Sequence, residues 1–304
     1  CFSQMKQHFV YTLYTERKLP MIKVASKKTF ALLGACLLTA LLAVVAFTGC
    51  SSDSSSQESS EDKTITVAAS PTPHAEILNN AVKPILEEQG YTLEVKEFTD
   101  YVQPNTVTEA GEVDANYFQH RPYLENFNAE QGTHLVEVAG VHFEPMGIFS
   151  SSIASLDELA DGATVAVPND ATNEARALLL LEQEGLIEVN DEAGINATIN
   201  DITSNPKNLE FEELEAANLP NVLQDVDIAV INGNYALAAD FTMDDALAVE
   251  ANDSLAAETY TNVIVVKDGN QDQEKIKALA EACNSDEVRD YITENYQGSV
   301  VAVF

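Results

Sequence analysis

From residue 64 onwards, the pattern of apolar and polar positions predicts strands and helices in alternation. Short apolar runs, as at 65–69 and 226–231, are typical of buried strands. Segments such as 73–89 and 173–184 instead carry apolar residues three and four apart, and each is followed by a glycine. Strands that alternate with helices predict mostly parallel sheets flanked by helices on both faces, which is an α/β fold.

The elements fall into two similar sets. The expected strands or extended segments are 65–69, 92–98, 113–118, 135–141, 146–149, 164–167, 209–214, 226–231 and 262–266. The expected helices are 73–89, 106–110, 122–131, 173–184, 216–224, 274–283 and 285–296, with a capped turn at 155–159. We therefore expect two lobes, one from 64–148 with 262–304 and the other from 149–261. A cleft between two lobes is a favoured place for a ligand.

Residues 21–50 have the pattern of a secretory signal. Basic residues at 23, 27 and 28 precede an apolar run at 30–47, and small residues lead to Cys50. This ending resembles a bacterial lipobox, in which the Cys is lipidated and becomes the mature N-terminus, although Phe47 replaces the usual leucine. Residues 1–20 are interpreted as upstream sequence and 51–63 as a flexible polar tether. An uncleaved membrane anchor is the alternative, and either reading places the remaining chain outside the cytoplasm at a membrane surface.

The charge is strongly negative, with 16 basic and 49 acidic residues and a formal net charge of −33. After Cys50 the balance is 10 basic against 48 acidic residues. This balance argues against nucleic acid or an anionic membrane face as a partner. Cleavage would leave two cysteines, Cys50 for the lipid and Cys283 in a helical segment, so we expect neither a disulfide nor a cysteine metal site.

One candidate group consists of aromatic residues. Phe118, His120 and Tyr123 lie at the end of a predicted strand, and Tyr101 follows the preceding strand. The carboxyl ends of parallel strands are where open α/β sheets bind ligands. An aromatic box with one histidine suits a polarisable apolar group such as a thioether, because sulfur–ring contacts contribute roughly 0.3–1.5 kcal/mol. Core packing is the alternative interpretation.

Two polar groups complete the candidate site. Asn173 and Arg176 share the first turn of a predicted helix, where a guanidinium and free backbone N–H groups suit a carboxylate. A surface ion pair of Arg176 with Glu174 or another acid is the alternative. Asn232 and Asn234 follow the strand 226–231, and their carbonyl oxygens could accept from an ammonium group, unless they serve only the turn. Together the groups match a zwitterionic amino acid with an apolar side chain.

Several long motifs resemble the methionine-binding lipoproteins of bacterial ABC importers, the MetQ/NlpA family. They include SPTPHAEIL (70–78), DANYFQHRPYL (114–124), EPMG (144–147), VPNDATNEARALLLL (167–181) and AVINGNYA (229–236), and the resemblance runs from about 65 to 288. It implies a two-lobed periplasmic-binding-protein fold of type II, with methionine, most simply L-methionine, in the cleft between the lobes. The ligand contacts that it implies are Tyr101, Phe118, His120, Tyr123, Asn173, Arg176, Asn232 and Asn234.

The resemblance also implies a monomer, lipid-anchored through Cys50, that delivers its ligand to a permease with its ATPase and needs no cofactor, metal or catalysis. D-methionine, a methionine-containing dipeptide or another small apolar amino acid stays open as the ligand. A metal-binding receptor is a remote alternative, because the histidines form no His-x-His or His-x-x-x-His pattern. A hydrolase lacks support, since no Gly-x-Ser-x-Gly occurs. A scaffold lipoprotein that has lost its ligand is a third possibility.

Overall fold

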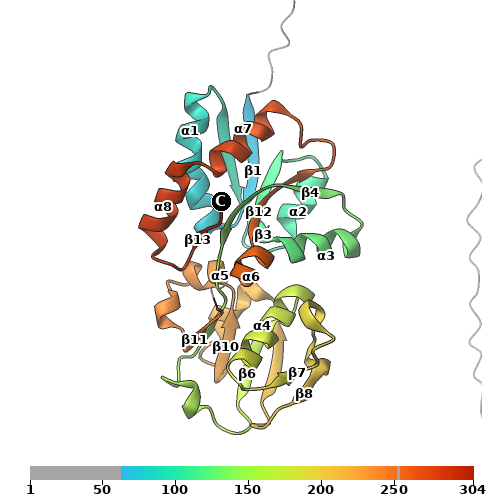
Figure 1. Ribbon diagram of the computed structural model, residues 1–304, viewed down its shortest axis with the longest axis vertical. Coiled ribbons are helices and arrows are strands. Elements are labelled where there is room, and N and C mark those ends of the chain that lie inside the picture. The colour runs from blue at the N-terminus through green and yellow to red at the C-terminus, as the bar shows by residue number, and fades with distance from the viewer. Residues whose placement is uncertain (1–62, 252–253) are drawn as a thin grey trace, which may run out of the picture. The chain divides into compact units, whose positions relative to one another are not determined.

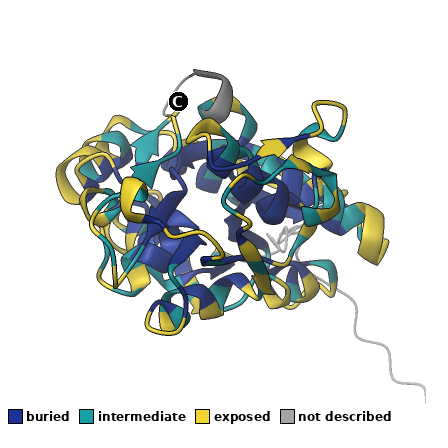
Figure 2. Ribbon diagram, turned by 90° about the horizontal axis from the view of Figure 1, so that it is seen from below, coloured by how far each residue is buried: buried dark blue, intermediate teal, exposed yellow. Residues whose placement is uncertain are grey.

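The computed structural model describes residues 63–251 and 254–304, which form two lobes, each built on one main sheet (Figure 1). The expected signal segment, Cys50 and the tether up to residue 62 lie outside the described residues. Among the described residues, no helix has the length and apolar character needed to cross a membrane. Buried positions follow the strands and the inner helix faces, and exposed positions lie at the periphery (Figure 2).

The first lobe contains a six-stranded sheet in the order β13-β4-β12-β3-β1-β2. Its strands are β1 (Thr64–Ala69), β2 (Thr92–Glu97), β3 (Ala115–His120), β4 (Leu135–Phe143), β12 (Asn262–Lys267) and β13 (Val301–Ala302). Its helices are η1 (Pro71–Ala75), η2 (Leu78–Val82), α1 (Lys83–Glu88), α2 (Gln103–Glu109), α3 (Arg121–Gln131), α7 (Glu274–Cys283) and α8 (Asp286–Tyr296). Successive side chains of β12 are buried on opposite faces of the sheet: Ile264 packs in the cluster with α7 and α8, and Val265 packs with Leu124 of α3.

The second lobe contains a five-stranded sheet in the order β11-β5-β10-β6-β9, with a separate β7–β8 pair. Its strands are β5 (Gly147–Phe149), β6 (Thr164–Pro168), β7 (Glu188–Val189), β8 (Ile202–Ser204), β9 (Glu210–Leu214), β10 (Ile228–Ile231) and β11 (Ala248–Val249). Its helices and helical turns are η3 (Leu156–Glu158), α4 (Ala171–Gln183), η4 (Gly194–Asn196), η5 (Ile199–Asp201), η6 (Ala216–Val222), α5 (Gly233–Ala238), η7 (Met243–Asp245) and α6 (Ser254–Thr259), the last leading back to β12. The apolar strand β10 packs Val230 with α4 on one face and Ile231 with η6 on the other.

The α/β class and the two-lobed fold are confirmed, but both sheets are mixed rather than mostly parallel. In the first sheet, β1 is parallel to β2 and β3, whereas β12 lies antiparallel to β3 and β4. In the second, β10 is parallel to β6 and antiparallel to β5. The reason is that the chain crosses between the lobes twice. After each crossing the next strand, β5 or β12, starts at the cleft and runs away from the cleft, whereas its parallel-sheet neighbours end at the cleft.

The sequence repeats a Val-Asp pair, and both aspartates have the same structural role. Each was expected inside a strand, yet Asp114 directly precedes β3 and Asp227 directly precedes β10. The Asp114 carboxylate accepts from the backbone N–H of Thr66, and that of Asp227 accepts from the N–H of Thr164, both at 2.8 Å. Each aspartate thus ties the start of its strand to the neighbouring parallel strand.

The limits of the two lobes stay a prediction. The first sheet takes its strands from 64–143 and 262–302, and the second from 147–249. Gly147 already pairs with β10 of the second sheet. We therefore propose that the first crossing lies at 144–146, slightly before the expected limit at 148.

Candidate functional site

A cavity lies between the two lobes. All eight predicted ligand residues line it, together with four residues that were not predicted. The lining residues are Tyr101, Phe118, Gln119, His120, Tyr123, Glu144, Asn173, Arg176, Asn232, Gly233, Asn234 and Asn262. The lobes touch around the cavity, because the Tyr101 hydroxyl donates to Asn234 Oδ1 at 2.5 Å and the Tyr235 hydroxyl donates to Thr99 O at 3.1 Å. The lobes are therefore closed on the site.

The first lobe supplies the aromatic wall, defined as Tyr101, Phe118, His120 and Tyr123. The ring centroid of Tyr101 lies 5.9 Å from that of Phe118 and 5.7 Å from that of Tyr123, which are typical distances for packed aromatic pairs. The Tyr123 hydroxyl donates to the carbonyl of Tyr101 at 3.0 Å. This bond ties the turn after β2 to helix α3, so the wall is assembled before any ligand enters.

His120 ends β3 and caps helix α3. Its Nδ1 accepts from the backbone N–H of Tyr123 at 3.2 Å, so Nε2 carries the proton and donates to Asn173 Oδ1 at 3.1 Å. Burial, reinforced by the charge of Arg176, lowers the pKa of His120 to about 3. At neutral pH this side chain is an uncharged hydrogen-bond bridge between the two lobes.

The second lobe supplies the polar wall, defined as Asn173, Arg176, Asn232 and Asn234. The amide of Asn173 is fully used: Oδ1 accepts from His120 and Asn232, and Nδ2 donates to Asp170, the N-cap of α4. Asn232, by contrast, is 5% exposed and its Oδ1 has no partner. A buried acceptor without a donor is rare and costly, so this oxygen is available to a ligand.

Arg176 is buried rather than on the surface, and its acidic partner is not Glu174. Its Nε and Nη2 donate to the carboxylate of Glu250 at 2.9 and 2.5 Å, and Nη2 also donates to Glu144 O at 2.7 Å. The guanidinium carbon lies 4.2 Å from the ring centroid of Tyr260. Burial opposes the charged form, but the attraction of Glu250 outweighs burial and raises the pKa of Arg176. The guanidinium is thus fixed and charged at the edge of the cavity.

Four lining residues were not predicted: Gln119, Glu144, Gly233 and Asn262. Gly233 is required by close packing, because a Cβ there would lie 2.9 Å from Glu144 Cβ and 3.0 Å from Pro145 O. The signal for Glu144 was present in the sequence, as the one acid inside the EPMG motif. Gln119 and Asn262 are buried polar residues within strands, and a polar residue in an otherwise apolar strand is also a signal for a functional site.

Asn105 follows the same strand as Tyr101, but it does not line the cavity. Its side chain exchanges hydrogen bonds with Gln119 at 2.9 and 2.6 Å and accepts from Asn116 at 3.0 Å. All three amides are buried and satisfied by one another. Asn105 and Asn116, which do not line the cavity, therefore support β3 and the lining residue Gln119.

A two-lobed α/β fold closed over one polar and aromatic cavity defines a substrate-binding protein of the periplasmic type. The chain belongs to the NlpA lipoprotein family, whose model matches residues 65–304, beyond the limit near residue 288 that the sequence motifs suggested.

Several similar proteins are named for the ligand that they bind. The chain is 42% identical to the methionine-binding lipoprotein MetQ of Bacillus subtilis, over 88% of this chain and 97% of that protein. It is 40% identical to the D-methionine-binding lipoprotein MetQ of Salmonella typhimurium, over 90% and 97% respectively. Among solved structures, a nutrient-binding protein from Burkholderia cenocepacia bound to methionine is 43% identical, with a TM-score of 0.75 over 79% of this chain and all of that one.

Proposed function

We propose that this protein captures methionine outside the cytoplasm and delivers it to an ABC importer, without chemical change to the ligand. The observation that carries the proposal is the pairing of two unlike walls around one cavity. The aromatic wall offers ring faces and edges to a thioether, while Arg176 offers a buried positive charge and Asn232 an unpartnered oxygen. Those are the complements of a side chain, a carboxylate and an ammonium group.

We further propose that Cys50 carries the lipid and that the residues after it act as a tether. A receptor held in this way stays near its permease at a high effective concentration. The names of the relatives, which are lipoproteins, support this arrangement. L-methionine is the first choice of ligand, and D-methionine is an alternative that the Salmonella relative supports by its name.

A metal receptor is the rival that one observation favours. His74, His142 and Glu144 place three possible ligand atoms within 4.8 Å of one another. However, His142 Nε2 lies only 2.6 Å from Glu144 Oε1. Two ligands on one zinc ion, with bonds of about 2.1 Å in a tetrahedron, would be separated by about 3.4 Å. The geometry supports a hydrogen bond in this position rather than a metal site.

The test begins with native mass spectrometry of protein purified without added ligand, followed by calorimetry after removal of any bound molecule. The titrants are L-methionine, D-methionine, a methionine-containing dipeptide, leucine and zinc. We expect one molecule of methionine per chain, weaker binding of leucine, and no stoichiometric binding of zinc. Stoichiometric zinc with no methionine binding would replace the proposed function by the rival.

A further inference from the structure

A buried carboxylate lies on the first crossing between the lobes, and it belongs to none of the eight predicted ligand residues. Glu144 directly follows β4, is 5% exposed and lines the cavity beside Gly233. Because Gly233 has no side chain, the backbone at the start of α5 approaches the Glu144 side chain closely. The carboxylate is therefore held between the two walls, within the ligand cavity.

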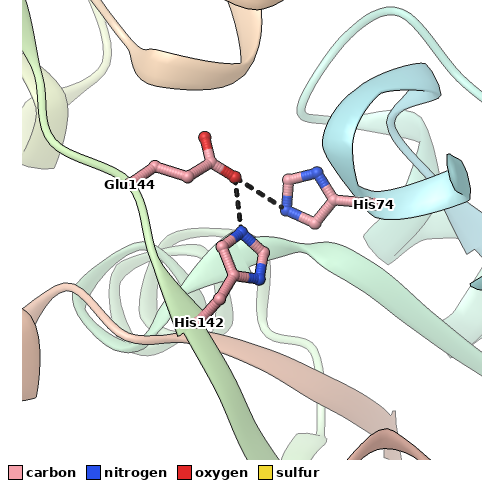
Figure 3. A group of neighbouring side chains, drawn as sticks. All are labelled: His74, His142 and Glu144. Atoms are coloured by element: carbon pink, nitrogen blue, oxygen red, sulfur yellow. Dashed lines mark hydrogen bonds and ion pairs between the residues drawn. The ribbon is translucent and has the colours of Figure 1, made fainter. Parts of the chain in front are cut away.

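Neutral N–H donors hold one side of this carboxylate (Figure 3). His142 Nε2 lies 2.6 Å and His74 Nε2 3.4 Å from Glu144 Oε1. The other nitrogen of His142 bonds the hydroxyl of Tyr117, and His74 Nε2 also contacts Asn262 Oδ1 at 3.0 Å. Burial lowers the pKa of His142 to about 3 and that of His74 to about 4. Both imidazoles are therefore uncharged at neutral pH and orient Glu144 without neutralising it.

The remaining groups around Glu144 do not supply a free cation either. The backbone N–H of Asn234 is a third neutral donor, and Tyr101 and Tyr117 are kept protonated because burial raises their pKa. Arg176 is the cation that attracts Glu144, but it is already paired with Glu250. The charge of Arg176 is thus shared between Glu250, which pairs with it, and Glu144, which lines the cavity. Burial accordingly raises the pKa of Glu144, in spite of its donors.

We propose that Glu144 is the charge partner of the ligand's ammonium group, acting together with the unpartnered Oδ1 of Asn232. Both acceptors line the same cavity, and a primary ammonium has three N–H donors to share between them. His74 and His142 are positioning residues that aim the carboxylate. The inference rests on the proposed function, which it sharpens: the site selects amino acids with a free, protonated amine over the same side chains without one.

The test compares two ligands that differ only in the amine, L-methionine and 4-(methylsulfanyl)butanoate, by calorimetry on ligand-free protein. We expect Glu144→Gln to weaken methionine binding roughly 10- to 100-fold, as for the loss of one partner of a buried charge pair, and to leave the amine-free analogue unchanged. Equal weakening of both ligands, or no weakening of methionine, would overturn the assignment. Failure of the wild-type protein to bind methionine would instead count against the proposed function itself.

Glu137→Gln is the matched control, because Glu137 lies on β4, the strand that Glu144 directly follows, is 30% exposed and pairs with Arg121 away from the cavity. It should bind both ligands like the wild type. The wild-type protein gives a second measurement that needs no variant. As the pH is lowered from 7, affinity for methionine should fall as Glu144 is protonated, because burial raises the pKa of its carboxyl group, whereas affinity for the analogue should not fall in parallel. A parallel pH response of the two ligands would contradict the proposal.

Discussion

The two walls of the cavity come from different lobes and are built on different principles. The aromatic wall is formed mainly by one short stretch, 118–123, whose rings pack on one another and on Tyr101. The polar wall gathers residues from the start of α4 and the turn after β10, linked by a network of amide hydrogen bonds. One wall is thus largely local in the sequence, and the other depends on long-range contacts.

The difference suggests a division of labour. Ring contacts are individually weak and tolerate small displacements, so the aromatic wall should contribute affinity and shape selection in modest increments. Buried charges and amides are costly when unpaired, so the polar wall should behave as a unit whose disruption is severe. The predictions below separate the walls by the size and kind of the effect.

The largest effect is expected in the polar wall, at Arg176. Arg176→Ala removes the cation next to the ligand carboxylate and leaves the partly buried Glu250 without its partner. We expect methionine affinity to fall by about 3–5 kcal/mol, as measured by calorimetry. Arg289→Ala is the control, since Arg289 is 42% exposed and pairs with Asp286 outside the cavity. Wild-type affinity in Arg176→Ala would remove the guanidinium from the ligand site.

The second effect is a loss of stability at low pH that comes from the aromatic wall. His120 in this wall can take up a proton, whereas the asparagine amides of the polar wall cannot. The pKa of His120 is about 3 in the folded protein against 6.5 unfolded, so the unfolded chain binds the extra proton first. The stability from keeping His120 neutral is complete above pH 6.5 and is lost as the pH falls towards 3. The loss should reach about 2 kcal/mol at pH 5.

Urea unfolding of the wild type and His120→Gln at pH 7 and pH 5 measures this term. The variant should lose less stability between the two pH values than the wild type, whatever its stability at pH 7. His134→Gln provides the matched control, because the side chain of His134 is 74% exposed, and it should follow the wild-type profile. An identical pH dependence in His120→Gln would show that the proton is taken up elsewhere.

The smallest effect is expected from ring removal in the aromatic wall. Phe118→Ala deletes one ring next to Tyr101 and Tyr123 and should weaken methionine binding by about 1–2 kcal/mol. Selectivity for methionine over leucine should also relax, because the lost contact favours sulfur. Competition calorimetry with the two amino acids measures both changes. If selectivity stays at the wild-type value, Phe118 does not contact the ligand side chain.

Much of this arrangement could be predicted from sequence because its signals are local. Helix α4 begins beside its N-cap Asp170 and is followed by Gly185. Cys283 lies in a helix as expected, and its burial raises the pKa of the thiol to about 12. Three of the four residues of the aromatic wall, Phe118, His120 and Tyr123, lie at the end of β3 and the start of α3. The direction of each strand in its sheet was harder to predict. An apolar run such as 262–266 has the same pattern whether the strand enters the sheet from the cleft or from the far side.

The sequence by itself determined the α/β alternation, the family motifs and eight of the twelve residues that line the cavity. These follow from period, composition and chain order, which are properties of neighbouring residues. The tertiary structure alone decided that Arg176 pairs with Glu250, 74 positions away, and that Glu144 meets His74 across the first lobe. Such pairs depend on which groups are buried together as each lobe folds, and burial is a property of the folded chain as a whole.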